Sequence, residues 1–217
     1  MKKLVLSILF LLGFVTNSNA ASVGFTISAA DISSDVKDDI DNNGTTNTTK
    51  SLSNDVVFGS IFFENALSDN LSVGIDFIPF DAEFESRSTT QTSIKGAGTS
   101  TSGTNKGTVD VSRHLTLYIQ PQREITNGLK VFGTLGLVRA DVDSKIVSIS
   151  SNNKDVSDTL EGIKLGLGLK KETGFGFVKL EYGRTDYDDI SATTSNNTKV
   201  TADIDTDILA LSVARSF

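Results

Sequence analysis

The sequence predicts an all-β fold, in which eight antiparallel strands run up and down and close into a transmembrane β-barrel. Three observations support this prediction. Apolar residues alternate with small or polar residues in a series of short segments, the connections between those segments alternate between long and short, and the last strand ends on Phe217. Because successive side chains of a strand point to opposite faces, each strand gives one apolar and one polar face, as a barrel wall in lipid requires.

Residues 1–20 are predicted to be a cleaved signal peptide. Lys2 and Lys3 supply its positive start, and the apolar run Leu4–Val15 is shorter than a spanning helix needs. Small residues then precede the predicted cleavage site after Ala20. The length of the apolar run disfavours the alternative, an N-terminal membrane anchor.

Residues 21–217 are predicted to form one outer-membrane β-barrel domain. Loss of two lysines with the signal peptide changes the formal net charge from −7 to −9, which disfavours nucleic acid as a partner. The chain has no cysteine, so packing or closed backbone hydrogen bonding must stabilise it after export. Two prolines, 18 glycines and the lack of a long apolar run after Ala20 favour continuous strands over helices.

The first four predicted strands contain three clear patterns and one ambiguous one. In the first strand, Val23, Phe25 and Ile27 alternate with small residues, and the third and fourth alternate similarly. The second is too continuously apolar for its register to be assigned, and a β-bulge is one explanation. The predicted strands are Ala21–Ala30, Leu52–Asn65, Leu71–Phe77 and Thr108–Arg123.

The last four predicted strands all alternate. The pattern is clearest where four large aliphatic residues alternate with glycines and lysines, between residues 162 and 170. These strands are Leu129–Val142, Gly162–Lys170, Val178–Gly183 and Leu209–Phe217.

The connections predict which end of the barrel faces outward. Short turns are expected at Ala66–Asn70, Glu124–Gly128 and Lys171–Gly174. Asn127 and Gly128 suit the positive φ angles of a tight turn. Long polar loops are expected at Asp31–Ser51, Glu85–Gly107, Asp143–Asp158 and Asp188–Lys199. In membrane barrels short turns lie in the periplasm and long loops outside, so both termini are predicted to be periplasmic.

The whole mature chain resembles the small bacterial outer-membrane β-barrels of the OmpX, Opa and OmpA transmembrane-domain type. The residues that match the family's C-terminal assembly signal are Leu209, Leu211, Val213 and Phe217. Arg215 stands where the family usually has an aromatic or apolar residue. The resemblance implies a place in the Gram-negative outer membrane, contact with its lipid and lipopolysaccharide, and recognition by the barrel-assembly machinery.

Charged residues on the polar faces predict a network inside the barrel, because buried charges must be paired or hydrated. The predicted members are Asp76, His114, Lys164, Lys170, Lys179 and Glu181. An eight-stranded barrel is narrow enough for side chains to fill it, so a plugged interior is favoured over a path for small polar solutes. Glycines at positions 24, 74, 166 and 168 would favour the path if they left voids.

No catalytic, cofactor or metal site is predicted. Ser112 and His114 would share a strand face, but in lipid-A hydrolases of similar fold the histidine comes first, and no acidic partner is near in sequence. Aspartates cluster in the first and fourth long loops and at the start of the last strand, without the spacing of a known calcium loop.

These features predict a non-enzymatic outer-membrane protein with a structural or adhesion-like surface role, acting through four long extracellular loops rich in Ser, Thr, Asn and Gly. A small porin-like channel for polar or amphipathic solutes is the main alternative. A lipid-A-modifying enzyme and a soluble lipocalin-like carrier are less favoured.

Overall fold

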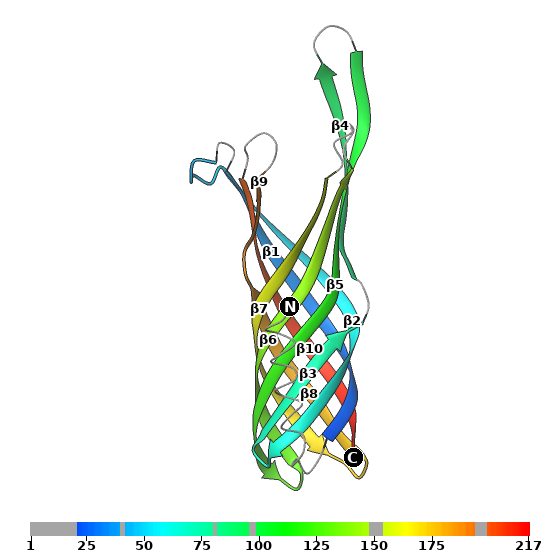
Figure 1. The fold of residues 1–217 in the computed structure, drawn as a ribbon, viewed down its shortest axis with the longest axis vertical. Helices are drawn as coiled ribbons and strands as arrows, with labels where there is room; N and C mark the ends of the chain where they lie inside the picture. The colour runs from blue at the N-terminus through cyan, green and yellow to red at the C-terminus, as the bar shows by residue number, and fades with distance from the viewer. Residues whose placement is uncertain (1–20, 40–41, 80–81, 96–98, 148–153, 194–198) are drawn as a thin grey trace.

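The computed structural model describes residues 21–39, 42–79, 82–95, 99–147, 154–193 and 199–217, and the predicted signal peptide lies outside this range. The described residues form one antiparallel sheet (Figure 1). Its strands are β1 Ala21–Asp39, β2 Thr48–Ser68, β3 Leu71–Ile78, β4 Ala82–Lys95, β5 Thr99–Thr126, β6 Leu129–Val147, β7 Lys154–Glu172, β8 Gly176–Tyr187, β9 Ile190–Thr193 and β10 Lys199–Ser216. In this part of the chain, no helix has the length and apolar character needed to cross a membrane.

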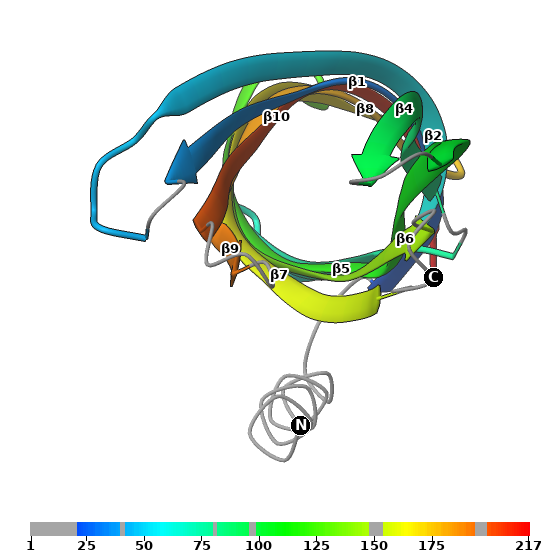
Figure 2. The ribbon, with the colours of Figure 1, turned by 90° about the horizontal axis from the view of Figure 1, so that it is seen from above.

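The sheet closes on itself, because β1 pairs with both β2 and β10. Figure 2, which looks along the barrel, shows the resulting ring. Eight strands form the wall in the order β1-β2-β3-β5-β6-β7-β8-β10, which confirms the predicted eight-stranded up-and-down barrel. In the described pairings, β4 joins only β5 and β9 joins only β10. Closure satisfies backbone hydrogen bonds that lipid cannot satisfy.

The outer surface of the wall is apolar, as the alternation predicts. Leu167 is 64% exposed and Leu211 is 52% exposed, whereas their inward neighbours are glycine, alanine or serine. The other exposed aliphatic and aromatic residues of this belt include Phe25, Ile27, Val57, Ile61, Ile119, Leu135, Leu137, Ile163, Leu165, Leu169, Leu180, Leu209 and Val213. A soluble lipocalin-like carrier would place this face inside, so the structure contradicts that alternative.

The structure establishes the register of β2, which the sequence left open. Each residue of β1 from Ala21 to Asp38 has a partner in β2, and Ile27 lies opposite Gly59. Val57 and Ile61 therefore face outward, while Phe62 and Glu64 are buried inside. A bulge is present, but it lies at the turn end of the strand, between Ala66 and Ser68.

The predicted long loops are largely strand, which corrects their bounds. β1 and β2 continue past the apolar belt, so only residues 40–47 connect them. The segment Glu85–Gly107 is mostly a hairpin made by β4 and the start of β5. Apolar alternation marks a strand only where one face is buried, so strands with both faces in water carry no such signal. Thr-rich sequences nevertheless have good β propensity.

The short turns lie together at the opposite end from these extensions (Figure 1). Asn127 and Gly128 have φ angles of 39° and 75°, as the tight-turn prediction requires. The C-terminus lies at this end too, where the Phe217 amide donates a hydrogen bond to the Ala21 carbonyl oxygen at 2.9 Å. The barrel therefore has short turns at one end. At the other end paired strands extend beyond the apolar belt as ribbons.

Candidate functional site: a charged network inside the barrel

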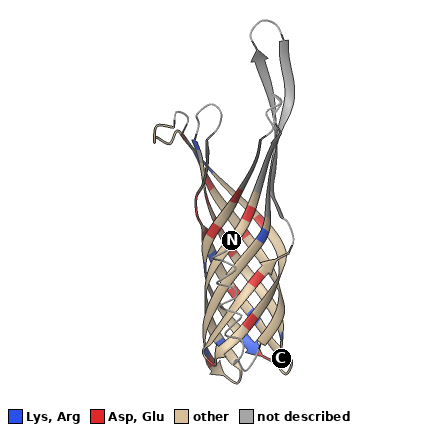
Figure 3. Cartoon of the chain, in the orientation of Figure 1, with Lys and Arg blue, Asp and Glu red and all other residues tan. Residues whose placement is uncertain are grey.

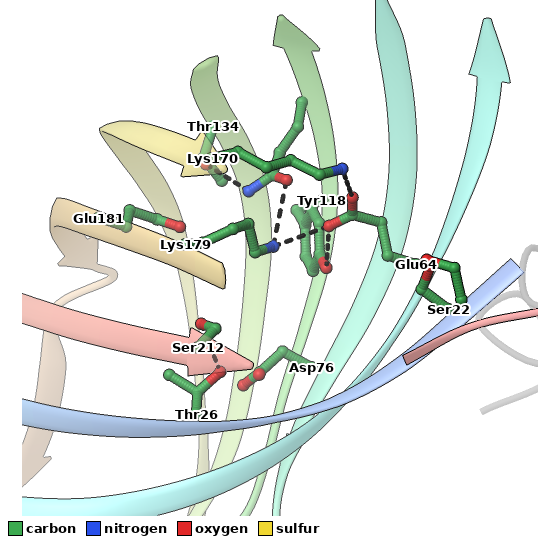
Figure 4. A network of polar contacts seen from close by, with 12 residues as sticks. Ser22, Thr26, Glu64, Asp76, Tyr118, Thr134, Lys170, Lys179, Glu181 and Ser212 are labelled. Carbon is green, nitrogen blue, oxygen red and sulfur yellow. Dashed lines mark hydrogen bonds and ion pairs between the residues drawn. The ribbon is translucent and has the colours of Figure 1, made fainter. Parts of the chain in front are cut away.

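Glu64 is the centre of a buried charged network inside the barrel (Figure 4). Its Oε1 atom accepts a hydrogen bond from Lys170 Nζ at 2.9 Å, and its Oε2 atom accepts one from Lys179 Nζ at 2.7 Å. The Tyr118 hydroxyl donates to the same Oε2 at 3.3 Å. The side chain of Glu64 is only 2% exposed, so these partners replace water as its hydrogen-bond donors.

Hydrogen bonds through uncharged side chains extend the network from Lys179 across the barrel. Lys179 Nζ donates to Gln120 Oε1 at 3.3 Å, and Gln120 Nε2 donates to Thr134 Oγ1 at 2.9 Å. These residues come from β8, β5 and β6, whereas Glu64 comes from β2. The network therefore joins strands on different sides of the ring, and it should restrain the shape of the barrel's cross-section.

Aromatic rings surround the two lysines. Lys170 Nζ lies 3.9 Å from the centre of the Phe177 ring, and Lys179 Nζ lies 4.5 Å from the centre of the Phe62 ring. Cations are attracted to the faces of such rings, most strongly where water is excluded. Phe62, Phe177 and Ala214 also form a buried apolar cluster beside the charges.

A second ion pair and a second carboxylate lie in the same interior. Lys164 Nζ is 2.9 Å from Glu181 Oε1, and the Ser60 hydroxyl donates to Asp76 Oδ2 at 2.7 Å. With Glu64, the interior thus combines three lysines with three carboxylates. Formal charge inside this part of the barrel is balanced.

Of the six residues predicted for the interior, five lie near this arrangement, and Glu64 is the member that the sequence analysis missed. Glu64 follows the continuous apolar run of the second strand, and that run hid which face it occupies. Two unmatched inward lysines on neighbouring strands, Lys170 and Lys179, were the signal that a further carboxylate was needed.

The inward glycines do not leave voids. A Cβ atom built at each of the four positions would collide with a large interior side chain. The pairs are Gly24 with Phe62, Gly74 with Tyr118, Gly166 with Glu181 and Gly168 with Phe132. The glycines therefore make room for the residues that fill the barrel, and the void argument for a solute path is wrong.

The upper interior contains an apolar cluster, which the sequence analysis did not predict. Ala140, Val142 and Leu160 form a buried cluster against which Tyr187 and Ile204 pack. These residues lie on the ribbon side of the charged network. The buried ion pairs therefore lie nearer the turns, and an apolar cluster together with uncharged polar residues such as Thr185 and Thr206 lies nearer the ribbons.

His114 lies at this level, where it contacts β8. Its Nε2 atom is 3.0 Å from the Tyr187 hydroxyl oxygen, a hydrogen bond from β5 to β8. Ser112 is not beside it, because a bulge with Arg113 at φ 49° shifts the register between Ser112 and Leu115. Ser112 lies opposite Asp141, on the outer face, while His114 faces inward. The expectation that these two residues share a face is wrong.

The remaining predicted residues lie on the outside. Leu209, Leu211, Val213 and Phe217 are all exposed, the first three in the apolar belt. The described members of the predicted aspartate clusters lie at the ribbon end, where Asp35 accepts a hydrogen bond from the Ser51 hydroxyl at 2.5 Å. Within the described residues, no group of three or more His, Cys, Asp or Glu side chains is arranged to hold a metal ion.

No protein-family model matches the chain, and no curated protein matches it in sequence. Solved structures of similar fold include Ail of Yersinia pestis, at 14% identity and a TM-score of 0.37 over 87% of this chain and 98% of Ail. The neisserial surface protein NspA has 11% identity and a TM-score of 0.41, over 89% of this chain and 97% of its own. The outer-membrane protease OmpT of Escherichia coli has 7% identity and a TM-score of 0.49, over 93% and 98%.

The class of protein follows from the chain's own geometry. A closed antiparallel wall, an apolar outer belt and an ion-paired interior satisfy the conditions for a strand protein that spans lipid. The chain is an integral outer-membrane β-barrel protein.

Proposed function

We propose that the chain is a non-enzymatic, non-conducting barrel with a structural or surface-interaction role. The observation that carries this proposal is the interior, where paired charges and aromatic rings occupy the space that a solute would need. Binding would then fall to the ribbons above the membrane, since rigid scaffolds commonly place recognition on such segments.

The ribbons give this proposal a physical basis. β1 and β2 pair as far as Asp38 and Thr48, and β6 and β7 pair as far as Ile146 and Lys154. The β4–β5 hairpin and the short β9–β10 pair add two more. Paired backbones lose less conformational entropy on binding than free loops do, so such ribbons can bind a partner with a small entropic cost.

A small channel is the rival function, and single-channel recording distinguishes the two. The wild-type protein, reconstituted in planar bilayers, is expected to give no regular conductance steps, because the interior is filled. A variant with Glu64→Ser, Lys170→Ser and Lys179→Ser removes the charges together and should conduct more often than the wild type. Reproducible unitary steps from the folded wild-type protein would contradict the proposal.

A lipid-A-modifying enzyme has less support. The Ser112–His114 pair that suggested it is split between the two faces of the wall. In the described residues His114 has Tyr187 as its hydrogen-bond partner, and Tyr187 packs against the apolar cluster of Ala140, Val142 and Leu160. We therefore propose no catalytic role for it.

The assembly signal remains a proposal. Leu209, Leu211 and Val213 lie on the outer face of β10, and this strand closes the ring against β1. An assembly machine that reads the last strand would find these side chains accessible before closure. The predicted signal peptide would bring the chain to that machine.

A further inference from the structure

Three positive residues mark one edge of the apolar belt. On β7 the outward residue after Leu169 is Lys171, and on β10 the outward residue after Val213 is Arg215. On β5 the outward series after Ile119 is Pro121 and then Arg123. On β7 and β10 the cation follows the last large apolar side chain of the strand, whereas on β5 the exposed Ile125 lies beyond Arg123.

The strand register places all three side chains outside. Lys171 lies opposite Leu129, and Arg215 lies opposite the exposed Val23. Arg123 lies opposite Val131. Opposed residues in an antiparallel pair share a face, so the three cations are on the same surface as the belt. All three are exposed.

These cations lack acidic partners, unlike the arginines at the other edge. No ion pair among the described residues involves Arg123, Lys171 or Arg215, and the Lys171 ammonium donates only to the Asn127 carbonyl oxygen, at 2.5 Å. At the ribbon edge the arginines are paired instead, all with carboxylates. The pairs are Arg113 with Asp141 at 2.5 Å, Arg139 with Glu161 at 3.1 Å, and Arg184 with Asp186 at 3.0 Å and Asp205 at 3.1 Å.

The opposite edge of the belt has the opposite sign. Asp31 is the outward residue after Ala29, Asp55 adjoins Val57, and Asp207 adjoins Leu209. The three aspartates are neighbours across the sheet, because Asp31 lies opposite both others. Figure 3 shows acidic and basic residues along the whole wall, with several acidic residues below the ribbons and basic residues at the end with the turns. The belt is thus bounded on one side by carboxylates and the arginines paired with them, and on the other side by three cations without an ion-pair partner among the described residues.

We propose that Arg123, Lys171 and Arg215 form a contact surface for anionic phospholipid headgroups in the periplasmic leaflet. The short turns place this edge on the periplasmic side. Long basic side chains at a membrane edge extend to the phosphate region while their stems stay in the apolar layer. Unpaired cations at this depth attract anionic lipid, and the attraction weakens as salt rises.

Lipid selectivity in vesicles tests the proposal directly. The full chain is folded in phosphatidylcholine vesicles that contain a trace of spin-labelled phosphatidylglycerol or spin-labelled phosphatidylcholine, and the immobilised fraction of each label is measured. The wild type should prefer the anionic label by roughly threefold or more at low salt. The variant with Arg123→Gln, Lys171→Gln and Arg215→Gln should bind both labels equally.

The control removes the same charge from the other edge. A variant with Arg113→Gln, Arg139→Gln and Arg184→Gln should keep the wild-type selectivity, because those arginines are paired with carboxylates. Heat-modifiable gel migration establishes that each variant is folded. An equal loss of selectivity in both variants would overturn the proposal.

Two further measurements use only the wild-type protein, so they do not depend on the folding of a variant. The preference for the anionic label should fall as ionic strength rises. A preference that is insensitive to salt would overturn the proposal. In asymmetric vesicles, selectivity confined to the leaflet that contacts the ribbon end would also overturn it.

Discussion

Replacing Glu64 with glutamine is expected to destabilise the folded barrel by about 3–5 kcal/mol, because it leaves two buried lysines without a counter-charge. Lys170 and Lys179 both donate to this carboxylate, and its side chain is almost wholly buried. The free energy of unfolding is measured by urea titration of the protein in detergent micelles or lipid vesicles.

An exposed ion pair provides the matched control. Glu161 pairs with Arg139 at 3.1 Å on the outer surface, and Glu161→Gln should cost less than about 1 kcal/mol. Removing the charges together, by Glu64→Leu with Lys170→Met and Lys179→Met, should recover part of the stability that the single change loses. Equal losses for Glu64→Gln and Glu161→Gln would show that the interior network contributes little.

Gly168→Val is expected to destabilise the barrel by about 3 kcal/mol or more, because overpacking of a filled interior forces both side chains and backbone to move. The new Cβ would collide with the Leu180 carbonyl oxygen and with the Phe132 ring. A rigid backbone atom cannot rotate aside as a side chain can. The same urea titration reports the change.

Gly133→Val is the control for this position. Gly133 lies on the outer face of the neighbouring strand, and the nearest atom to its Cβ position is the Gly166 carbonyl oxygen at 3.8 Å. Valine there should change the stability by less than about 1 kcal/mol. If the interior were open, valine would be tolerated equally well at the two positions. That result would contradict the conclusion that side chains fill the barrel.

The wall was predictable from sequence because lipid on one side and side chains on the other impose a period of two. The run between residues 162 and 170 shows this most clearly, and the model places its leucines outside. The same logic failed in β2, where Phe62 is an inward aromatic residue between outward apolar residues. Such a run does not alternate between apolar and polar residues. The face that Glu64 occupies therefore became clear only from the pairing of β2 with β1.

The ribbons and the His114 site were missed for different reasons. The β4–β5 hairpin was predicted as a loop because its Ser-, Thr- and Gly-rich sequence has no alternation of apolar and polar residues. A bulge at Arg113 adds one residue to β5 and so places Ser112 and His114 on opposite faces. No residue type in the sequence signals this bulge. Interior glycines suggested voids because sequence spacing cannot show which bulky side chain lies across the barrel.

Cysteine labelling tests most directly whether the leucine face of the barrel lies in lipid, and the chain contains no native cysteine to interfere. Leu167→Cys, on the belt, is compared with Thr45→Cys at the ribbon end and Gly174→Cys in a turn. With a membrane-impermeant maleimide on intact cells, only Thr45→Cys should react. After the outer membrane is permeabilised, Gly174→Cys should react as well, while Leu167→Cys should remain unlabelled. Rapid labelling of Leu167→Cys in the folded protein would contradict the account.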